Sequence, residues 1–503
     1  MPVPDAPEPL IFERSRPGRR ALRLPEIDVP EPSRPEDDLP SGWLRARPPA
    51  LPEVGEPEVV RHFTRLSRRN FAVDTGMYPL GSCTMKYNPK INDTLAGLDG
   101  FAGLHPSAPD ALAQGALALL WELEQDLCRL TGMDAFSLQP AAGAHGELVG
   151  MLIASAYHRA RGDSARRRVV VPDAAHGTNP ASAAMAGFEV VEVGTDARGG
   201  IDLEQVRAHA DGRLAALMLT NPNTLGLFEG EVREVAQVVH QAGGLLYYDG
   251  ANLNAIVGRA RPADMGFDVC HLNLHKTFST PHGMGGPGAG PVGVTRRLSP
   301  YLPGPLVRRR DVPAVAGPRY AWDDPGPESI GRVRALHGNF GVLVRAYAYI
   351  RANGGSGLRE VSGHAVLAAN YLAALLRPWL PASHDRICMH EVVTDGRALA
   401  PHGLRALDLC KALLDRGFHA PTMYFPLIVP EALMFEPTET EPREAIEALA
   451  AAVGEIVALA ERDPEAVRQA PTQTPVGRVD EASAARRPVL RWYPSEGDRA
   501  PEG

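Results

Sequence analysis

The feature that most constrains the fold is a series of short, continuous apolar runs in the middle of the chain. Between residues 167 and 276 these runs are RRVVVPD, FEVVEV, LAALMLTNPN, GLLYYDGAN and VCHLNLHK, and helix-like or turn-like segments separate them. Strands that are apolar throughout, rather than alternating, are typical of a parallel sheet whose two faces are both buried. The sequence therefore predicts an α/β layer architecture with a mostly parallel sheet.

The regions before these runs predict further elements. Residues 1–65 are rich in proline and charge and lack a hydrophobic period, which predicts an extended N-terminal arm. The spacing in DALAQGALALLWELEQDLCRLTGM predicts a helix that ends at Gly132. A second helix is predicted at LVGMLIASAYHRAR, directly after the loop LQPAAGAHGE.

A smaller α+β unit is predicted in the C-terminal part. Residues 300–335 are rich in proline and arginine and predict a surface connection, and helical stretches follow near 336–378. Strands are predicted at CMHEVV and TMYFPLIV, with helices at GLRALDLCKALLDRGF and PREAIEALAAAVGEIVALAERD. We therefore expect an N-terminal arm (1–65), a large domain (66–335), a small domain (336–475) and a polar tail (476–503).

Composition narrows the class of protein. The chain has 503 residues, of which 44% are hydrophobic and 22% charged, as in ordinary globular proteins of more than one domain. A formal net charge of -8 disfavours a nucleic-acid binder, and no apolar run is long enough to span a membrane. The N-terminus lacks a signal-peptide pattern and the five cysteines form no C-x-x-C pair, so we expect a cytoplasmic protein without a disulfide framework.

Lysine is scarce in this chain, although arginine is plentiful. The four lysines are Lys86, Lys90, Lys276 and Lys411. Arginine stays protonated and cannot supply the neutral amine that a Schiff base requires, so a covalently held carbonyl cofactor would use one of these four residues. Lys276 stands in the motif HLNLHKTFSTPHGMGGPGAGP, where histidines precede it and glycines follow it.

Three kinds of site are compatible with this motif. Residues 283–288 match G-x-G-x-x-G, but a dinucleotide loop needs a helix after it, and here a strand-like, proline-broken segment follows. His271 and His275 have the spacing of metal ligands on a helix, but their segment has the character of a strand and no nearby carboxylate. The third kind of site, pyridoxal phosphate bound to Lys276, explains more of the surrounding residues than a dinucleotide or a metal ion does. We therefore predict no metal site.

Other residues supply the remaining contacts of such a cofactor. Asp249 ends an apolar run and is placed to pair with the pyridinium nitrogen, although a turn or cap aspartate would also stand there. The loop 141–147 leads into a helix whose N-terminus favours a phosphate, and its His145 is placed to stack on the ring. Asn223 ends another run and is placed either to bind the ring hydroxyl or to form an ordinary turn. This chain order is typical of the aspartate-aminotransferase-like (fold type I) class of pyridoxal phosphate enzymes.

Long motifs throughout the chain resemble the glycine cleavage system P-protein family. They are MYPLGSCTMKYNPK, FAGLHPSAPD, AAGAHGE, AHGTNPASAAMAGFEVV, TNPNTLGLFE, YYDGANLNAIVG, NLHKTFSTPHGMGGPGAGPVGV and TMYFPLIVPEALMFEPTETEPRE. The length resembles the C-terminal half of the protein, called subunit 2 where the protein is split. The resemblance implies a decarboxylase that releases CO2 from glycine and passes the aminomethyl group to the lipoyl arm of H-protein. It also implies an α2β2 assembly with subunit 1.

Matched position by position, the resemblance also implies roles for individual residues. Lys276 is similar to the Schiff-base lysine, and Asp249 to the pyridinium partner. The implied cofactor contacts are the phosphate loop Ala142, Gly143 and Ala144, the ring-stacking His145, and Asn273 and His275 near the phosphate. The implied lining of a substrate channel is Ser82, Cys83, Thr84, Lys86 and His176, although Lys86 also fits an ordinary surface lysine.

Two other functions remain open at this point. Another fold-type-I lyase or a desulfurase would share the lysine motif, but a desulfurase needs a nucleophilic cysteine on a late loop, and Cys388 and Cys410 stand in strand-like and helix-like segments. A non-catalytic interaction subunit would not need Lys276 and its flanking motif.

Overall fold

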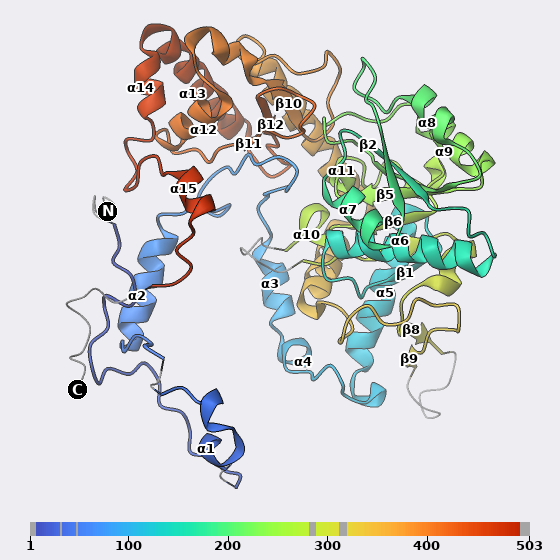
Figure 1. The fold of residues 1–503 in the computed structure, drawn as a ribbon, viewed down its shortest axis with the longest axis horizontal. Coiled ribbons are helices and arrows are strands. Elements are labelled where there is room, and N and C mark those ends of the chain that lie inside the picture. Colours follow the sequence, from blue (N-terminus) through green and yellow to red (C-terminus); the bar gives the residue numbers. More distant parts are fainter. Residues whose placement is uncertain (1–6, 31–32, 47–48, 281–287, 311–318, 493–503) are drawn as a thin grey trace. The chain divides into compact units, whose positions relative to one another are not determined.

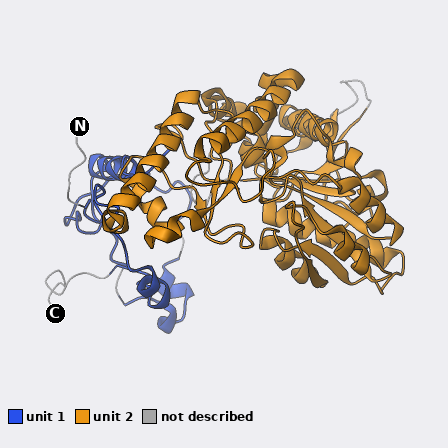
Figure 2. Cartoon of the chain, turned by 90° about the horizontal axis from the view of Figure 1, so that it is seen from above, with its two compact units in different colours: residues 1–72, 470–503 blue, residues 73–469 orange. Residues whose placement is uncertain are grey.

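The structure is a computed structural model that describes residues 7–30, 33–46, 49–280, 288–310 and 319–492. The chain forms two compact units, of which the larger comprises residues 73–469 and the smaller comprises residues 1–72 and 470–503 (Figure 2). The division into four regions that we expected from the sequence stays a prediction. The glycine-rich residues 283–287 after the lysine motif lie outside the described residues.

The smaller unit joins the two ends of the chain through side-chain contacts. Its helices are α1 (Pro35–Asp38), α2 (Glu56–Ser67) and α15 (Glu481–Arg486). Glu8 accepts hydrogen bonds from Arg65, and the ring of Phe12 stacks on Trp492 with a centroid distance of 4.8 Å. The N-terminal segment that the sequence predicted to be extended therefore contains a helix of three turns, α2, which the sequence analysis missed.

A seven-stranded sheet forms the centre of the larger unit (Figure 1). The strand order is β1-β7-β6-β5-β4-β2-β3. The strand β7 is antiparallel to both of its neighbours, β1 and β6, and all other neighbouring strands are parallel. The strands are β1 (Ala135–Ser137), β2 (Arg168–Pro172), β3 (Glu189–Val193), β4 (Leu214–Thr220), β5 (Leu245–Gly250), β6 (Val269–Leu272) and β7 (Val292–Val294). The five apolar runs of the sequence became β2 to β6, which confirms the predicted mostly parallel sheet.

Both faces of the sheet are buried at its central strands, which explains why β4, β5 and β6 are largely apolar, whereas the edge strand β3 is mostly not buried. Leu217 and Tyr248 pack into one core, whereas Ala216 and Tyr247, the residues next to them in sequence, pack into another on the opposite face. All four side chains are at most 1% exposed. An alternating pattern would have left polar side chains against one of the two helical layers.

Helices cover both faces of the sheet (Figure 1). On α9, residues spaced three and four apart are buried, as expected for an amphipathic helix on a sheet. Gly132 ends α5 in the left-handed region with φ 76°, as predicted. The helices before the C-terminal region are α3 (Lys90–Ala96), α4 (Asp99–Ala102), α5 (Gln114–Thr131), α6 (Gly143–Ala160), α7 (Thr178–Met185), α8 (Leu203–His209), α9 (Val232–Gln241), α10 (Leu274–Thr277) and α11 (Phe340–Leu376).

The C-terminal region forms a smaller antiparallel sheet with helices, as predicted. Its strands are β10 (Val392–Asp395), β11 (Thr422–Met423) and β12 (Ala432–Phe435), in the order β10-β12-β11. Its helices are α12 (Ala406–Leu414), α13 (Arg443–Arg462) and α14 (Pro464–Gln469). The strand predicted at TMYFPLIV was wrong in extent, because only its first two residues pair and the central strand is β12, which follows it.

The proline-rich segment that was predicted to be a surface connection contains a two-stranded hairpin. Its strands are β8 (Leu306–Arg309) and β9 (Tyr320–Asp323), and Val307 and Ala321 are buried. The two arginines of β8, Arg308 and Arg309, are consecutive and exposed, so no alternating pattern in the sequence indicated this strand. Among the described residues, no helix has the length and apolar character needed to cross a membrane.

Candidate active site

A cavity of about 250 Å³ lies where the central strands of the main sheet end. Thr220 is the last residue of β4, Asp249 stands near the end of β5, and Asn273 follows β6. Ligands of open α/β sheets bind outside the carboxyl ends of the strands, because loops converge there while the sheet itself is filled with apolar side chains. The lining residues are Ser82, Ala142, Gly143, Ala144, Glu147, His176, Thr178, Thr220, Thr224, Asp249, Ala251, Asn252, Asn273, His275, Lys276, Glu391 and Phe425.

Lys276 projects from a short helical turn rather than from a strand. The strand β6 ends at Leu272, and Asn273 is the N-cap of the four-residue helix α10, which carries His275 and Lys276. The amide of Thr277 donates to the carbonyl of Asn273 at 3.2 Å, which closes this turn. The structure thereby brings the predicted lysine into the cavity together with Asp249.

Asp249 is a buried carboxylate that the surrounding groups keep ionised. Its Oδ1 accepts a hydrogen bond from the amide of Ala251 at 2.9 Å and lies 3.4 Å from Nε2 of His271. Burial alone raises the pKa of Asp249, but His271, the Ala251 amide and Lys276 outweigh burial, so the pKa lies below its ordinary value. A fixed negative charge is what a protonated pyridine nitrogen requires as its partner.

The N-terminus of α6 forms another wall of the cavity. Ala142, the N-cap residue, has an extended backbone without a side-chain cap, so the first amide groups of this 18-residue helix stay available to a ligand. Gly143 faces the side chain of Asn273, and a Cβ at Gly143 would lie 2.5 Å from Asn273 Oδ1. That Oδ1 is buried and has no hydrogen-bond partner in the described part of the chain. Free amide groups at a helix N-terminus and the helix dipole together suit an anionic group.

His176, rather than His145, reaches the cavity. His176 lines it, accepts a hydrogen bond on Nδ1 from the amide of Thr178 at 3.3 Å, and packs its ring edge-on to Phe425 at 5.9 Å. Burial lowers the pKa of His176, and the charge of Lys276 lowers it further, which favours the neutral imidazole. His145 accepts a hydrogen bond from the amide of Ala141 at 3.2 Å and does not line the cavity. The structure therefore places in the cavity the histidine expected in the channel, and not the one expected to stack on the ring.

Asn223 does not contribute to this cavity. Its Nδ2 donates to the carbonyl of Gly199 and to Glu229, both at 2.7 Å, and its Oδ1 accepts from the amides of Leu225 and Leu227. These four bonds use the complete hydrogen-bonding capacity of the amide group. The expected contact of Asn223 with a ring hydroxyl is therefore corrected to a turn-forming role, while Thr220 and Thr224 from the same segment line the cavity.

Two lining residues that the sequence analysis missed are buried acids. Burial raises the pKa of Glu147 to about 8, and the charge of Asp249 contributes to the rise. Burial also raises the pKa of Glu391 to about 8, with a further contribution from Glu436. Both acids are therefore mostly protonated near neutral pH and can act as hydrogen-bond donors. Glu391 could have been identified from the sequence, because the polar pair His390–Glu391 interrupts an apolar run.

A hydrogen bond from a backbone amide connects Glu391 to the polar loop that contains Ser82. The amide of Ser82 donates to Glu391 Oε2 at 2.8 Å, whereas Oε1 has no partner among the described residues. His390 Nε2 lies 3.8 Å from Glu391, and burial lowers the pKa of His390 to about 3, so this imidazole is neutral. Ser82 lines the cavity, as the resemblance implied.

The other residues of the expected channel lie behind this wall. Thr84 is 1% exposed, and its amide donates to Glu436 at 3.1 Å. Cys83 is partly buried, and burial raises the pKa of its thiol. Lys86 is 3% exposed and forms an ion pair with Glu439 at 2.8 Å, so it neither lines the cavity nor lies on the surface.

Two clusters near the cavity have the side chains that a metal ion prefers. One comprises Glu147, Asp249 and His271, and the other comprises His390, Glu391 and Glu436, with ligand atoms within 4.8 Å of one another in each cluster. Every one of these six residues is buried. The expectation that this protein has no metal site stays a prediction.

Sequence comparison identifies the family that carries this site. The family model of the glycine cleavage system P-protein matches residues 36–312, and that of the glycine dehydrogenase C-terminal domain matches residues 361–473. The chain belongs to the glycine cleavage system P-protein family. It is similar to the probable glycine dehydrogenase (decarboxylating) subunit 2 of Desulforamulus reducens, with 56% identity over 97% of this chain and 99% of the relative. The corresponding protein of Thermotoga maritima is 54% identical over 96% of this chain and 99% of the relative.

Solved structures show the same fold. A glycine decarboxylase (P-protein) of the glycine cleavage system in inhibitor-bound form has a TM-score of 0.68 at 22% identity, covering 86% of this chain and 91% of that chain. The cysteine desulfurase of Thermococcus onnurineus NA1 has a TM-score of 0.58 at 17% identity, covering 76% of this chain and 95% of that chain. The predicted fold type I architecture is thereby confirmed.

Proposed function

We propose that this chain is the catalytic subunit 2 of a P-protein that decarboxylates glycine, with pyridoxal phosphate bound at Lys276. The observation that carries the proposal is the cavity in which Lys276, Asp249 and the N-terminus of α6 meet in a member of this family. Each of the three matches one chemical demand of the cofactor, namely an amine for the aldehyde, a carboxylate for the ring nitrogen and amides for the phosphate.

The residues of the cavity fit this cofactor. Gly143 leaves space at the first turn of α6, because a Cβ at this position would lie 2.5 Å from Asn273 Oδ1. We assign the phosphate to the first turn of α6 together with Asn273 and His275, and the pyridine nitrogen to Asp249. In place of His145 we assign the ring-facing role to His176, whose imidazole lines the cavity.

When bound, pyridoxal phosphate would supply an electron sink for the bond that breaks when glycine loses CO2. The protein's part is to hold the reacting groups and to move protons. Asp249 would hold the ring nitrogen in its protonated form, because a buried carboxylate favours a positive partner over a neutral one. Lys276 would hold the aldehyde of the cofactor, and its amine can also carry a proton. Glu391 lines the same cavity, is mostly protonated and can donate its proton through Oε1, which has no other hydrogen-bond partner among the described residues.

The finer parts of the proposal concern the partners. The relatives are named subunit 2, which implies a subunit 1. We propose that this chain assembles with subunit 1 as an α2β2 tetramer and passes the aminomethyl group to the lipoyl arm of H-protein. A cytoplasmic location belongs to the same proposal, and the five cysteines, all of which are free thiols, agree with it.

The alternative functions are less well supported by the site. A desulfurase uses a reactive cysteine thiolate, whereas burial raises the pKa of both Cys388 and Cys410 to about 12. A non-catalytic subunit would have no reason to keep a lysine in a cavity with Asp249 and the open end of α6.

The test is an absorption spectrum of the purified chain with and without glycine. The proposal predicts a visible cofactor band that glycine perturbs, that Lys276→Ala abolishes and that Lys90→Met, a change at an exposed lysine, leaves intact. Exchange of labelled CO2 into glycine then separates decarboxylation from other cofactor chemistry. If no band appears in the isolated chain, the spectrum is repeated with subunit 1, and a second negative result would refute the assignment of Lys276.

A further inference from the structure

Lys86 is a buried lysine in a chain that has only four lysines. Its side chain is 2% exposed, and that of its ion-pair partner Glu439 is 5% exposed. An ammonium group without water loses a large hydration energy, and an ion pair in such a place is often no more stable than two apolar side chains of the same size. Stability alone is therefore a weak explanation for a lysine at this position.

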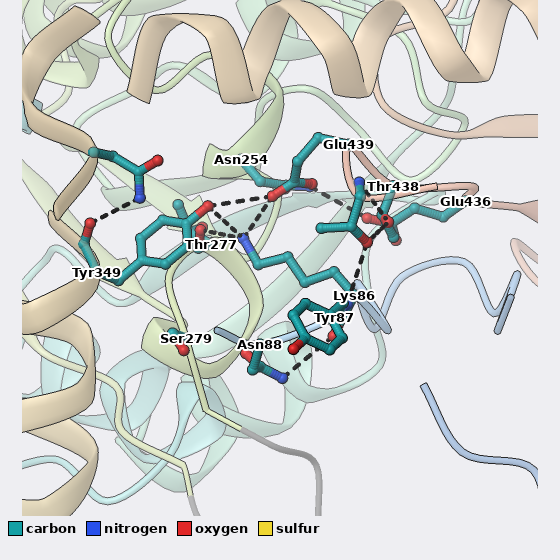
Figure 3. A network of polar contacts seen from close by, with 12 residues as sticks. Lys86, Tyr87, Asn88, Asn254, Thr277, Ser279, Tyr349, Glu436, Thr438 and Glu439 are labelled. Carbon is teal, nitrogen blue, oxygen red and sulfur yellow. Dashed lines mark hydrogen bonds and ion pairs between the residues drawn. The ribbon is translucent and has the colours of Figure 1, made fainter. Parts of the chain in front are cut away.

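The contacts of Lys86 are specific (Figure 3). Its Nζ donates to the carbonyl oxygen of Thr277 at 2.8 Å, to Glu439 Oε1 at 2.8 Å and to the hydroxyl of Tyr349 at 3.3 Å. An ammonium group has three N–H donors, so all of them are used. A planar guanidinium could not direct its donors to three acceptors around one point, which gives a reason for lysine in a chain that otherwise prefers arginine.

The charge of Lys86 is maintained in this environment. Burial by itself lowers the pKa of Lys86, but Glu439 and Tyr349 outweigh burial, so the pKa lies above its ordinary value. The Nζ also lies 4.6 Å from the centre of the Tyr349 ring, a distance at which the ring face attracts a cation. The network is therefore held by a full positive charge.

The position of the Thr277 carbonyl connects this network to the cavity. Thr277 follows Lys276 directly and is the last residue of α10. The next two residues are also fixed, since the ring of Phe278 packs edge-on to Tyr349 at 6.3 Å and Ser279 Oγ accepts a hydrogen bond from Asn92 at 2.9 Å. The turn that carries Lys276 is thus attached at three successive residues.

The network also restrains the loop that presents Ser82 to the cavity. Ser82 and Thr84 have left-handed backbones, with φ 62° and 47°, which are strained for residues other than glycine. Their amides are held by the carboxyl groups of Glu391 and Glu436, and Lys86 ends the same loop. A strained loop keeps its shape only when such surrounding contacts over-determine it.

We propose that Lys86 is a positioning residue for the reaction. Its buried ammonium group connects α10, the turn that carries Lys276, to Tyr349 of α11 and to Glu439, and thereby fixes the position of this turn. The proposal rests on the proposed function in that Lys276 is taken as the lysine that binds the cofactor. Lys86 itself touches neither the cavity nor a substrate.

The test compares variants that separate positioning from the loss of an ion pair. Lys86→Met leaves the carboxylate of Glu439 buried without a cation, with only the hydroxyl of Tyr349 among the described residues donating to it, and can fail to fold. The double variant Lys86→Met/Glu439→Gln removes both charges at similar volume and is the main probe. Lys90→Met is the matched control, because Lys90 stands four residues along, pairs with Asp74 and is 58% exposed.

The first readout needs no cofactor and uses amide hydrogen exchange of the full chain. We expect the peptide that covers residues 273–280 to exchange at least about tenfold faster in the double variant, while strand β5 keeps its protection. Unchanged exchange of this peptide in the folded double variant would overturn the proposal, as would the same acceleration in Lys90→Met.

The second readout is the visible absorption of the chain loaded with pyridoxal phosphate, titrated with acid and base. A loosened turn should move the pH midpoint of the band by about half a unit or more, whereas a purely structural role would lower stability and leave the midpoint of the folded protein unchanged. An unchanged midpoint in the folded double variant would also overturn the proposal. If wild-type protein forms no band either alone or with subunit 1, the proposed function fails, and the exchange experiment still decides the role of Lys86.

Discussion

The acid Glu391 gives the most quantitative prediction, which concerns how stability depends on pH. Burial raises the pKa of this carboxyl from its ordinary value of 4.5 to about 8 in the folded protein. Between these two values the folded state holds a proton that the unfolded state releases. The stability contributed by this proton is therefore complete below about pH 4.5 and is lost as the pH rises through about 8.

The variant Glu391→Gln cannot titrate, so the difference between variant and wild type isolates this effect. Each pH unit within the window changes the free energy of unfolding by about 1.4 kcal/mol for one proton. From about pH 5.5 to about pH 7.5, the stability of the variant should therefore rise relative to wild type by about 2 to 3 kcal/mol. The other buried acids are present in both proteins, and the substitution directly affects only Glu436, whose charge contributes to the raised pKa of Glu391.

The assay is urea unfolding of the ligand-free chain at several pH values, followed by far-ultraviolet circular dichroism. Glu455→Gln is the control, because Glu455 is 70% exposed and keeps its contact with water in the folded state. A difference between Glu391→Gln and wild type that stays constant with pH would refute the argument that Glu391 is buried as a neutral acid. If the stability of Glu391→Gln instead fell relative to wild type as the pH rises, the pKa of Glu391 would be lowered by folding and not raised.

Three further substitutions test the cavity and the packing of Gly226 against the backbone of Glu391. Asp249→Asn preserves shape but not charge, and should retain the cofactor band while lowering glycine-dependent CO2 exchange at least about 100-fold, since the ring nitrogen loses its partner. Gly143→Ala places a Cβ 2.5 Å from Asn273 Oδ1, and equilibrium titration should show an affinity for pyridoxal phosphate at least about tenfold weaker with unchanged urea stability. Gly226→Ala forces a side chain at φ +74° to within 2.2 Å of the carbonyl of Glu391, so urea unfolding should show a loss of more than about 2 kcal/mol. Wild-type values in these three assays would contradict the respective geometry.

Much of the fold was predictable because its signals are local. The five apolar runs became β2 to β6, and Gly132 ended α5 as predicted, since strand burial and helix capping depend on neighbouring residues in the sequence. The strand at TMYFPLIV was wrong in extent for the same reason. Apolar, β-branched residues permit a strand there, but the pairing partner decides which residues form one, and β12 pairs with both neighbours.

The candidate site was predictable only in part. Lys276, Asp249 and the start of α6 belong to segments that follow one another along the chain and end at one edge of the sheet, so their order indicated a shared site. The sequence analysis assigned the ring to His145 and the channel to His176, but in the structure His176 lines the cavity and His145, in the first turn of α6, does not. The sequence analysis also placed Asn223 in the site, although its amide group forms a turn.

The sequence by itself determined the α/β class, the lysine that can bind a carbonyl cofactor and the carboxylate that can serve its ring. The tertiary structure alone decided which polar residues act together. Ser82 and Glu391 are 309 positions apart, and Lys86 reaches a carbonyl 191 positions away, so no local pattern could join them. The physical reason is burial. A carboxyl or ammonium group acquires its charge state from the groups that replace water around it, and folding brings those groups from distant parts of the chain.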